Sequence, residues 1–189
     1  MKFSTAAAFC SALALTSAAP CGQTQADPEI KDGDVFRLIT IRSGSPIQYG
    51  TVSARNRGLI VNSESPQNAT CTRDGVNEAY FKLDDGSLYL NTQETELKFF
   101  VDRSGMGQGV MQYTSGPPVR NGETTGFAIS ESGHLEFKGT GFQACPDALG
   151  GGYTVWLSGI DEPAGIEGCL GFVAKAIKAD IPIACEYTQ

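Results

Sequence analysis

The chain has 189 residues, of which 41% are apolar and 9% aromatic, which is enough for one domain with a hydrophobic core and too few for two of ordinary size. Charged residues make up only 19%, and 23 glycines and 9 prolines interrupt the chain often, which excludes a coiled coil, a long-helix bundle and a largely disordered chain. The net charge is −7 and no basic cluster stands out, which argues against nucleic acid as a partner.

Residues 1–18 have the pattern of a secretory signal peptide. Lys2 supplies the positive charge, residues 6–15 the short apolar stretch and residues 16–18 the small-residue cleavage site. We expect cleavage after Ala18, which leaves 13 basic and 21 acidic residues and a net charge of −8. No later stretch reaches the roughly 18 apolar residues that cross a bilayer, and the polar chain end does not resemble a GPI signal. We therefore expect a secreted, extracellular protein without a membrane anchor.

Residues 19–34 form a polar, acidic lead that we expect to be exposed, and residues 35–189 form a single β domain. Short apolar runs, several with apolar and polar residues alternating, are separated by Gly, Asp, Asn and Ser, which is typical of antiparallel strands. The expected fold is all-β, a single antiparallel β-sandwich or barrel domain with disulfides. Strands are expected at 35–41, 46–53, 58–62, 78–83, 87–91, 97–102, 109–114, 126–130, 134–138, 141–145, 153–158, 170–177 and 183–187.

Two hairpins are the clearest local structures. They span residues 80–90 and 127–137, and Asp, Ser and Gly supply the tight reversals at 84–87 and 130–133. Both follow the pattern Phe-x-[Leu/Ile]…Gly-x-Leu-x-[Leu/Phe], about 47 residues apart. A third copy would indicate a β-trefoil, but residues 35–71 lack the same hairpin. The β-trefoil is therefore the alternative, ranked behind the sandwich or barrel.

The expected mature chain keeps five cysteines, an odd number that predicts two bridges and one leftover thiol in an oxidising compartment. If residues 170–177 and 183–187 form a tight hairpin, Cys169 and Cys185 lie roughly 20 Å of strand apart and cannot be bridged. The preferred pairing is then Cys145 with Cys169, and Cys71 joins Cys185 or Cys21. Cys21 lies in the exposed lead, so it is the expected free thiol, able to form a disulfide-linked dimer.

Asn68 begins the only N-x-[ST] triplet in the chain. The triplet lies in the polar run 62–74, where a loop would expose it to the glycosylation machinery. We expect Asn68 to carry a glycan; the alternative is a chance triplet beside a structural cysteine.

No residue pattern defines an active site. The single histidine, His134, follows a turn, and no G-x-S-x-G motif is present. A glycosidase pair such as Asp84 with Asp102 is an alternative, because that mechanism needs only two acids about 5 to 9 Å apart. Without a C-x-x-C pair there is no expected metal site, and no cofactor is expected.

The run 101–109 is unusual because glycines alternate after a strand. A phosphate cradle would need a helix to follow, yet Val110 continues as strand. The run is either a tight loop whose backbone Asp102 and Arg103 fix, or a binding loop in which Arg103 and Gln108 donate hydrogen bonds.

Trp156 is the only tryptophan. Alternation places it on one face of its strand with Thr154, while Tyr153, Val155 and Leu157 share the other face. It either fills the core or stacks on a sugar. The candidate binding residues are Asp102, Arg103, Gln108 and Trp156.

These features resemble the PhiA-type cell-wall proteins of filamentous fungi, and the resemblance covers nearly the whole mature chain. The eight-residue run from Val101 to Gln108 is its most specific part. The other matching segments are 42–49 (RSGSPIQY), 85–90 (DGSLYL), 142–146 (FQACP) and 185–189 (CEYTQ).

The resemblance implies a secreted, non-enzymatic fungal cell-wall protein with a role in phialide and conidium development, related to proteins that act as fungal antigens. It carries over no catalytic residues. Its implied partners are cell-wall polysaccharide or other wall proteins. The alternative function is that of a carbohydrate-active enzyme, a glycosidase with paired carboxylates.

Overall fold

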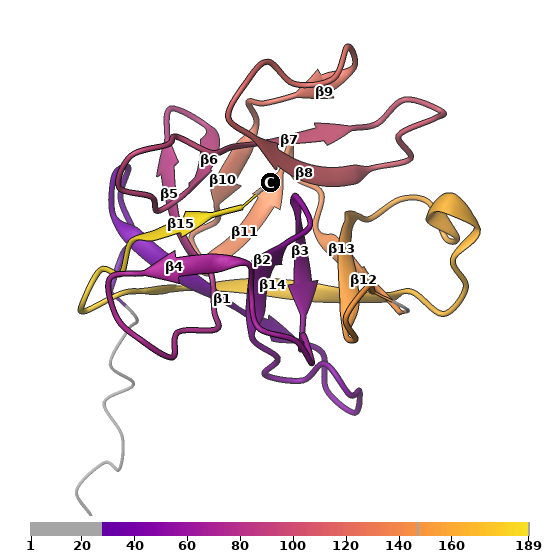
Figure 1. The fold of residues 1–189 in the computed structure, drawn as a ribbon. Helices are drawn as coiled ribbons and strands as arrows, with labels where there is room; N and C mark the ends of the chain where they lie inside the picture. The colour runs from indigo at the N-terminus through magenta and orange to yellow at the C-terminus, as the bar shows by residue number, and fades with distance from the viewer. Residues whose placement is uncertain (1–27, 147, 189) are drawn as a thin grey trace, which may run out of the picture.

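The structure, a computed structural model, describes residues 28–146 and 148–188. The expected signal peptide, Cys21 and most of the acidic lead lie outside the described residues. The strands are β1 (Val35–Ile41), β2 (Val52–Arg55), β3 (Gly58–Val61), β4 (Ala69–Cys71), β5 (Tyr80–Asp84), β6 (Ser87–Leu90), β7 (Lys98–Asp102), β8 (Val110–Thr114), β9 (Gly122–Glu123), β10 (Phe127–Ile129), β11 (His134–Phe137), β12 (Phe142–Cys145), β13 (Tyr153–Leu157), β14 (Leu170–Lys178) and β15 (Cys185–Tyr187), with one short 3-10 turn, η1 (Pro163–Gly165). The expectation of an all-β, antiparallel fold with disulfides is confirmed (Figure 1).

Six strands close into a ring. β1 pairs with β5, β5 with β6, β10 with β11, β11 with β14, and β14 with β1. β6 and β10 complete the circle, because the N–H groups of Gly126 and Phe127 both donate to the carbonyl oxygen of Gly86. Closure leaves no open edge in this ring, which corresponds to the barrel among the expected architectures.

Three further hairpins cap the ring. They are β2 with β3, β7 with β8, and β12 with β13. One strand of each hairpin meets the others, since β13 pairs with both β3 and β8, and the N–H of Tyr113 in β8 donates to the carbonyl of Arg57 beside β3. The three hairpins therefore converge on one axis.

The chain repeats one unit three times, over residues 35–84, 87–129 and 134–178. In each unit the first and last strands pair in the ring and the middle two form a capping hairpin. In the middle unit, β9 and β10 together serve as the last strand: β9 pairs with β7, and β10 closes on β6. A six-stranded ring with three hairpins is the β-trefoil arrangement, which the sequence analysis had ranked as the alternative.

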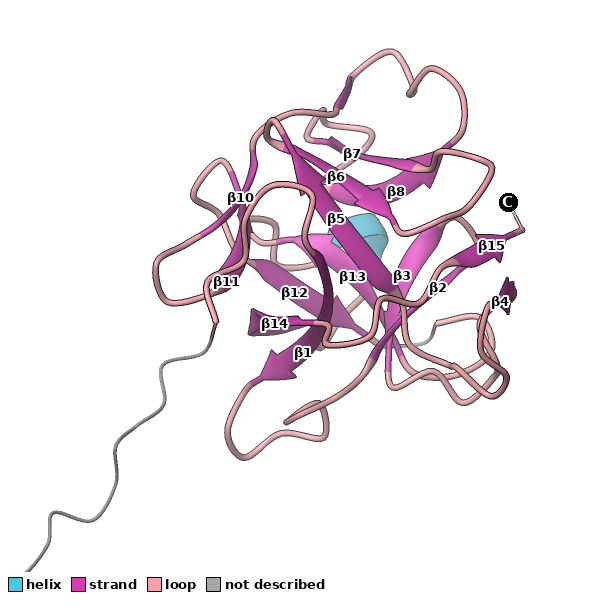
Figure 2. Cartoon of the chain, turned by 90° about the vertical axis from the view of Figure 1, so that its left-hand side faces the viewer, coloured by secondary structure: helices cyan, strands magenta, loops and turns pink. Residues whose placement is uncertain are grey.

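The third ring hairpin is hidden from the sequence because the chain ends build it. β1 and β14 pair over six residues, from Phe36 opposite Lys178 to Ile41 opposite Val173, and Figure 2 shows them side by side. The repeated hairpins at β5–β6 and β10–β11 are continuous in the chain. The β1–β14 pair takes the equivalent place in the ring, but no turn connects its two strands.

The core follows the threefold repeat. Equivalent positions in β1, β6 and β11 point inward and are at most 3% exposed: Phe36 and Leu38, Leu88 and Leu90, and Leu135 and Phe137. An aromatic row, Phe36, Phe81, Phe99, Tyr113 and Tyr187, crosses the interior with neighbouring ring centroids 5.5 to 6.4 Å apart. Burial of each such side chain contributes about 2 kcal/mol to stability. The strands therefore turn the apolar side of their alternating pattern towards the interior.

The two expectations for the chain near Tyr49 and near the C-terminus are corrected by the structure. The expected strand 46–53 is mostly a turn: Tyr49 has φ 57°, the N–H of Gly50 donates to Ile47, and β2 begins at Val52. The expected hairpin of 170–177 with 183–187 does not form. β14 pairs with β1, β11 and β12 instead, while β15 pairs with β4, a strand that the pattern did not indicate.

The disulfides are Cys71–Cys185 and Cys145–Cys169. Cys71 in β4 lies directly opposite Cys185 in β15. All four cysteines of the described residues are thus paired, and the argument against Cys169–Cys185 was built on a hairpin that is absent. Both pairings in the structure are among those that the sequence analysis had considered.

Candidate functional site

The loop of residues 102–109 is fixed by hydrogen bonds within itself. The Asp102 carboxylate accepts from the N–H of Ser104 at 2.9 Å, and the N–H of Gly109 donates to the Asp102 carbonyl at 2.7 Å. A Cβ atom at Gly107 would lie 2.2 Å from Cγ of Asp102. Gly107 therefore allows the backbone to fold tightly over the Asp102 side chain.

Arg103 and Gln108, the two expected donors of this loop, contact the rest of the chain. Arg103 forms two hydrogen bonds with Glu123 at 2.7 and 2.9 Å, and Lys138 also donates to Glu123. The hydrogen bonds from Arg103, then from Lys138, lower the pKa of Glu123 to about 2. The side-chain oxygen Oε1 of Gln108 accepts from the N–H of Ala164 in η1 at 2.5 Å. These contacts hold neighbouring segments together.

A groove of about 260 Å³ opens where the three capping hairpins meet. We call it the axial groove. All three hairpins line it, mainly through Leu59 and Ile60 of β3, Val110 to Gln112 of β8, and Thr154 to Trp156 of β13. All three units of the chain thus contribute to a single surface.

Trp156 is half-buried and lines the axial groove. Its indole N–H donates to the Thr154 hydroxyl at 2.9 Å, and that hydroxyl donates to the Cys145 carbonyl at 3.3 Å. Val155 and Leu157 are buried on the other face. Asp102, Arg103 and Gln108 do not line the groove, so the structure does not bring the four candidate binding residues together.

The groove contains two polar groups that the sequence analysis did not identify. Asn56 and Gln112 line it, and no hydrogen bond within the described part of the chain engages the side-chain amide of either residue. Asn56 lies in the β2–β3 turn, where Asn56 and Arg57 have φ of 51° and 63°. Such a turn suits Asn, so the run Arg-Asn-Arg-Gly between apolar segments was the available signal.

The outer wall of the groove is a segment closed by a disulfide. Pro146, Ala148, Leu149 and Ile166 line this side, and all lie between Cys145 and Cys169, which are bonded. Leu149 is 79% exposed. The bridge therefore holds an apolar wall beside Trp156.

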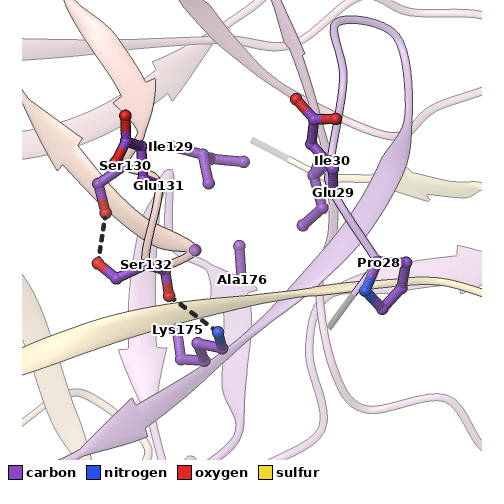
Figure 3. Close-up of a pocket in the computed structure, with 10 residues that line it drawn as sticks. Pro28, Glu29, Ile30, Ile129, Ser130, Glu131, Ser132, Lys175 and Ala176 are labelled. Atoms are coloured by element: carbon purple, nitrogen blue, oxygen red, sulfur yellow. Dashed lines mark hydrogen bonds between the residues drawn. The ribbon is translucent and has the colours of Figure 1, made fainter. Parts of the chain in front are cut away.

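A larger cavity, about 410 Å³, lies elsewhere on the surface. Figure 3 shows Glu29 and Ile30 on one side of it and the Ser130–Ser132 turn on the other. The Ser130 and Ser132 hydroxyls lie 2.9 Å apart, and the Lys175 ammonium donates to the Ser132 carbonyl at 2.9 Å. Its two serines and Lys175 bond to each other, and no aromatic residue of the described chain lines it, so the axial groove is the stronger candidate for a site that binds a ring-shaped ligand.

The acid and imidazole side chains considered for catalysis lie on three different strands. Asp84 ends β5 and Asp102 ends β7. His134 begins β11, with Nδ1 3.1 Å from the Ser132 hydroxyl. Within the described ranges no three His, Cys, Asp or Glu residues gather in a way that could hold a metal ion. No helix in that part of the chain has the length and apolar character needed to cross a membrane.

The fold and groove define a class of protein: an all-β, disulfide-bonded trefoil with one candidate binding groove on its axis. The chain belongs to the PhiA-like secreted protein family, whose model matches residues 36–188. It is 39% identical over 193 residues to the "Cell wall protein phiA" of Emericella nidulans, with 100% of both chains covered.

Two further relatives carry the same name. The Aspergillus fumigatus protein is 39% identical over 183 residues, with 95% of each chain covered. The Aspergillus niger protein is 40% identical over 158 residues, with 82% of this chain and 85% of the relative covered. No solved structure matches the chain.

Proposed function

We propose that this secreted protein is retained in the fungal cell wall by holding a wall polysaccharide non-covalently in the axial groove. The observation that carries the proposal is that half-buried Trp156 lines the same groove as Asn56 and Gln112, whose side-chain amides are unengaged within the described residues. The names of the relatives, each a cell wall protein, support the location.

The groove offers a complementary group for each of the two surfaces that a sugar ring presents. A pyranose has an apolar face of C–H groups and a rim of hydroxyls, so it packs on an aromatic ring while its hydroxyls bond to nearby amides. The hydrogen bond of Trp156 to Thr154 fixes the indole before a ligand arrives. A ring that is already ordered loses less conformational entropy on binding.

The proposed action is binding without catalysis. The Asp102 carboxylate is committed to the amide of Ser104, and neither Asp84 nor Asp102 lines the axial groove. A polysaccharide-bound protein of this kind would act in phialide and conidium development by its presence in the wall of the spore-bearing cell.

Two other features add to surface attachment. Asn68 is exposed and immediately precedes β4, a position accessible to glycosylation. Because Cys71, Cys145, Cys169 and Cys185 are paired, Cys21 would be the leftover thiol of the mature chain. We propose that Asn68 carries a glycan and that Cys21 can link two chains.

The first test is binding of the purified protein to isolated fungal walls. We expect Trp156→Ala to weaken binding roughly tenfold, the loss typical of an aromatic anchor. Tyr49→Ala is the matched control, because Tyr49 is 69% exposed and lies outside the groove. Circular dichroism would verify that both variants fold. Equal binding by the wild type and Trp156→Ala would refute the proposed site.

The second test is extraction of native walls, first with salt, then detergent, then reductant. Non-covalent binding predicts release before any glucan is digested, and a fraction linked through Cys21 would appear only with reductant. Release that requires glucan digestion would contradict non-covalent retention.

A further inference from the structure

Arg55 ends β2 at the edge of the axial groove, and its guanidinium has an unusual environment. Its Nε and Nη1 atoms are buried and have no hydrogen-bond partner. Among the described residues it is the only charged side chain in that state. Arg37 and Arg103, by contrast, are paired with Glu78 and Glu123.

The local backbone is shaped around this guanidinium. A Cβ atom at Gly150 would lie 2.2 Å from Nη1 of Arg55, and Gly150 has φ +91°. The glycine therefore lets the 148–152 backbone cover one edge of the guanidinium, withdrawing it from water. The third nitrogen, Nη2, is not buried in this way. Because Arg55 lines the groove, Nη2 is the open edge of the guanidinium.

A cation that is partly removed from water and unpaired is costly, and an anion at its open edge would offset that cost. None of the described residues that line the groove is Asp or Glu; Asp147, between the lining residues Pro146 and Ala148, lies outside the described residues. The lack of acidic side chains among the described lining residues is notable in a chain of net charge −7, whose field elsewhere repels anions.

We infer that the axial groove is selective for an acidic saccharide, with the carboxylate or phosphate of a charged sugar bound to Arg55 and the sugar ring packed on Trp156. This inference rests on the proposed function and adds the ligand's charge to it. Charge-assisted bonds to guanidinium are about twice as strong as neutral ones. Nothing else in the groove requires the ligand to be charged.

Trp156 is the only tryptophan, so its fluorescence reports directly on the groove. The probes are a glucuronic acid oligosaccharide, a neutral glucose oligosaccharide of equal length, and glucose 6-phosphate against glucose. We expect each acidic probe to bind about tenfold more tightly than its neutral partner, corresponding to one charge-assisted bond. The acidic probe with the larger gain in affinity over its neutral partner identifies whether carboxylate or phosphate is the preferred group.

Arg55→Gln should abolish the preference for acidic probes, so that the acidic and neutral members of each probe pair bind equally. Arg57→Gln, which changes an exposed arginine two residues away, is the matched control and should keep the preference. If Arg55→Gln fails to fold, the salt dependence of the wild type replaces it: the acidic preference must shrink as sodium chloride rises.

Equal affinity of the wild type for acidic and neutral probes would overturn the inference while leaving the proposed function standing. Absence of binding to every saccharide, and to isolated walls, would overturn the proposed function itself. An acidic preference that survives in Arg55→Gln would assign the charge selectivity elsewhere and also overturn the inference.

Discussion

The 102–109 loop and the axial groove differ in how their polar groups are used. In the loop, the side chains that could bind a ligand, Arg103 and Gln108, bond to other segments of the chain. In the groove, Asn56 has no partner in the described chain and two nitrogens of Arg55 are buried without one. The unusual glycine pattern of the loop thus reflects a tightly folded backbone. The unpartnered polar side chains of the groove, by contrast, are available to a ligand.

The largest effect should come from removing the disulfide that holds the groove wall. In the double variant Cys145→Ala with Cys169→Ala, the bridge across 24 residues is lost, which should reduce the free energy of unfolding by about 3 kcal/mol. Urea unfolding measures the loss. Binding to isolated walls should fall as well, because Leu149 and Ile166 are no longer held beside Trp156. Unchanged binding to isolated cell walls would show that the disulfide-closed segment beside Trp156 is not part of the binding site.

A glycine pair tests whether the loop is structural. Gly107→Ala places a Cβ atom 2.2 Å from Cγ of Asp102, and such overpacking should cost about 2 to 3 kcal/mol. Gly105→Ala meets no atom within 4 Å and should leave the unfolding free energy within about 0.5 kcal/mol. Wall binding should be unaffected in both variants. Equal stability of the two would contradict the tight packing over Asp102.

The smallest effect concerns the anchor of the loop at Glu123. Arg103 and Lys138 hold the pKa of Glu123 near 2, below its ordinary 4.5, so the contribution of this carboxylate to stability is complete above about pH 4.5. It is lost as the pH falls from there towards 2.

Glu123→Gln should therefore cost about 1 kcal/mol at pH 7, since both partners are partly exposed and screened. It should cost almost nothing near pH 2. Thermal unfolding across this pH range compares the two proteins. A difference that stays constant from pH 7 to pH 2 would exclude the ion pair as its cause.

Sequence patterns correctly predicted the structural elements that depend on neighbouring residues in the chain. The β5–β6 turn follows from Asp85 and Gly86, both of which have positive φ, as a two-residue hairpin requires. The expected strand 46–53 failed because Tyr49 adopts a left-handed φ of 57°, which β propensity does not reveal. The trefoil ranked second because its third ring hairpin joins β1 to β14, a pairing that no short window contains.

The candidate site was only partly predictable for a similar reason. Trp156 was identified by its rarity and by the alternation of its strand. Arg55, Asn56 and Gln112 come from two other hairpins, and only the convergence of β3, β8 and β13 brings them to Trp156. A groove assembled from three repeats has no linear motif.

The pairing of β1 with β14 also determines the order in which a secreted chain can mature. Phe36 is bonded opposite Lys178, so during translocation the first strand has one neighbour, β5, long before the other emerges. Until nearly the whole chain has crossed, the ring is open and its inward side chains face solvent, a state in which long-range sheets fold slowly and aggregate readily. The Cys71–Cys185 bond must wait for the same late segment, because Cys185 follows Cys71 by 114 residues.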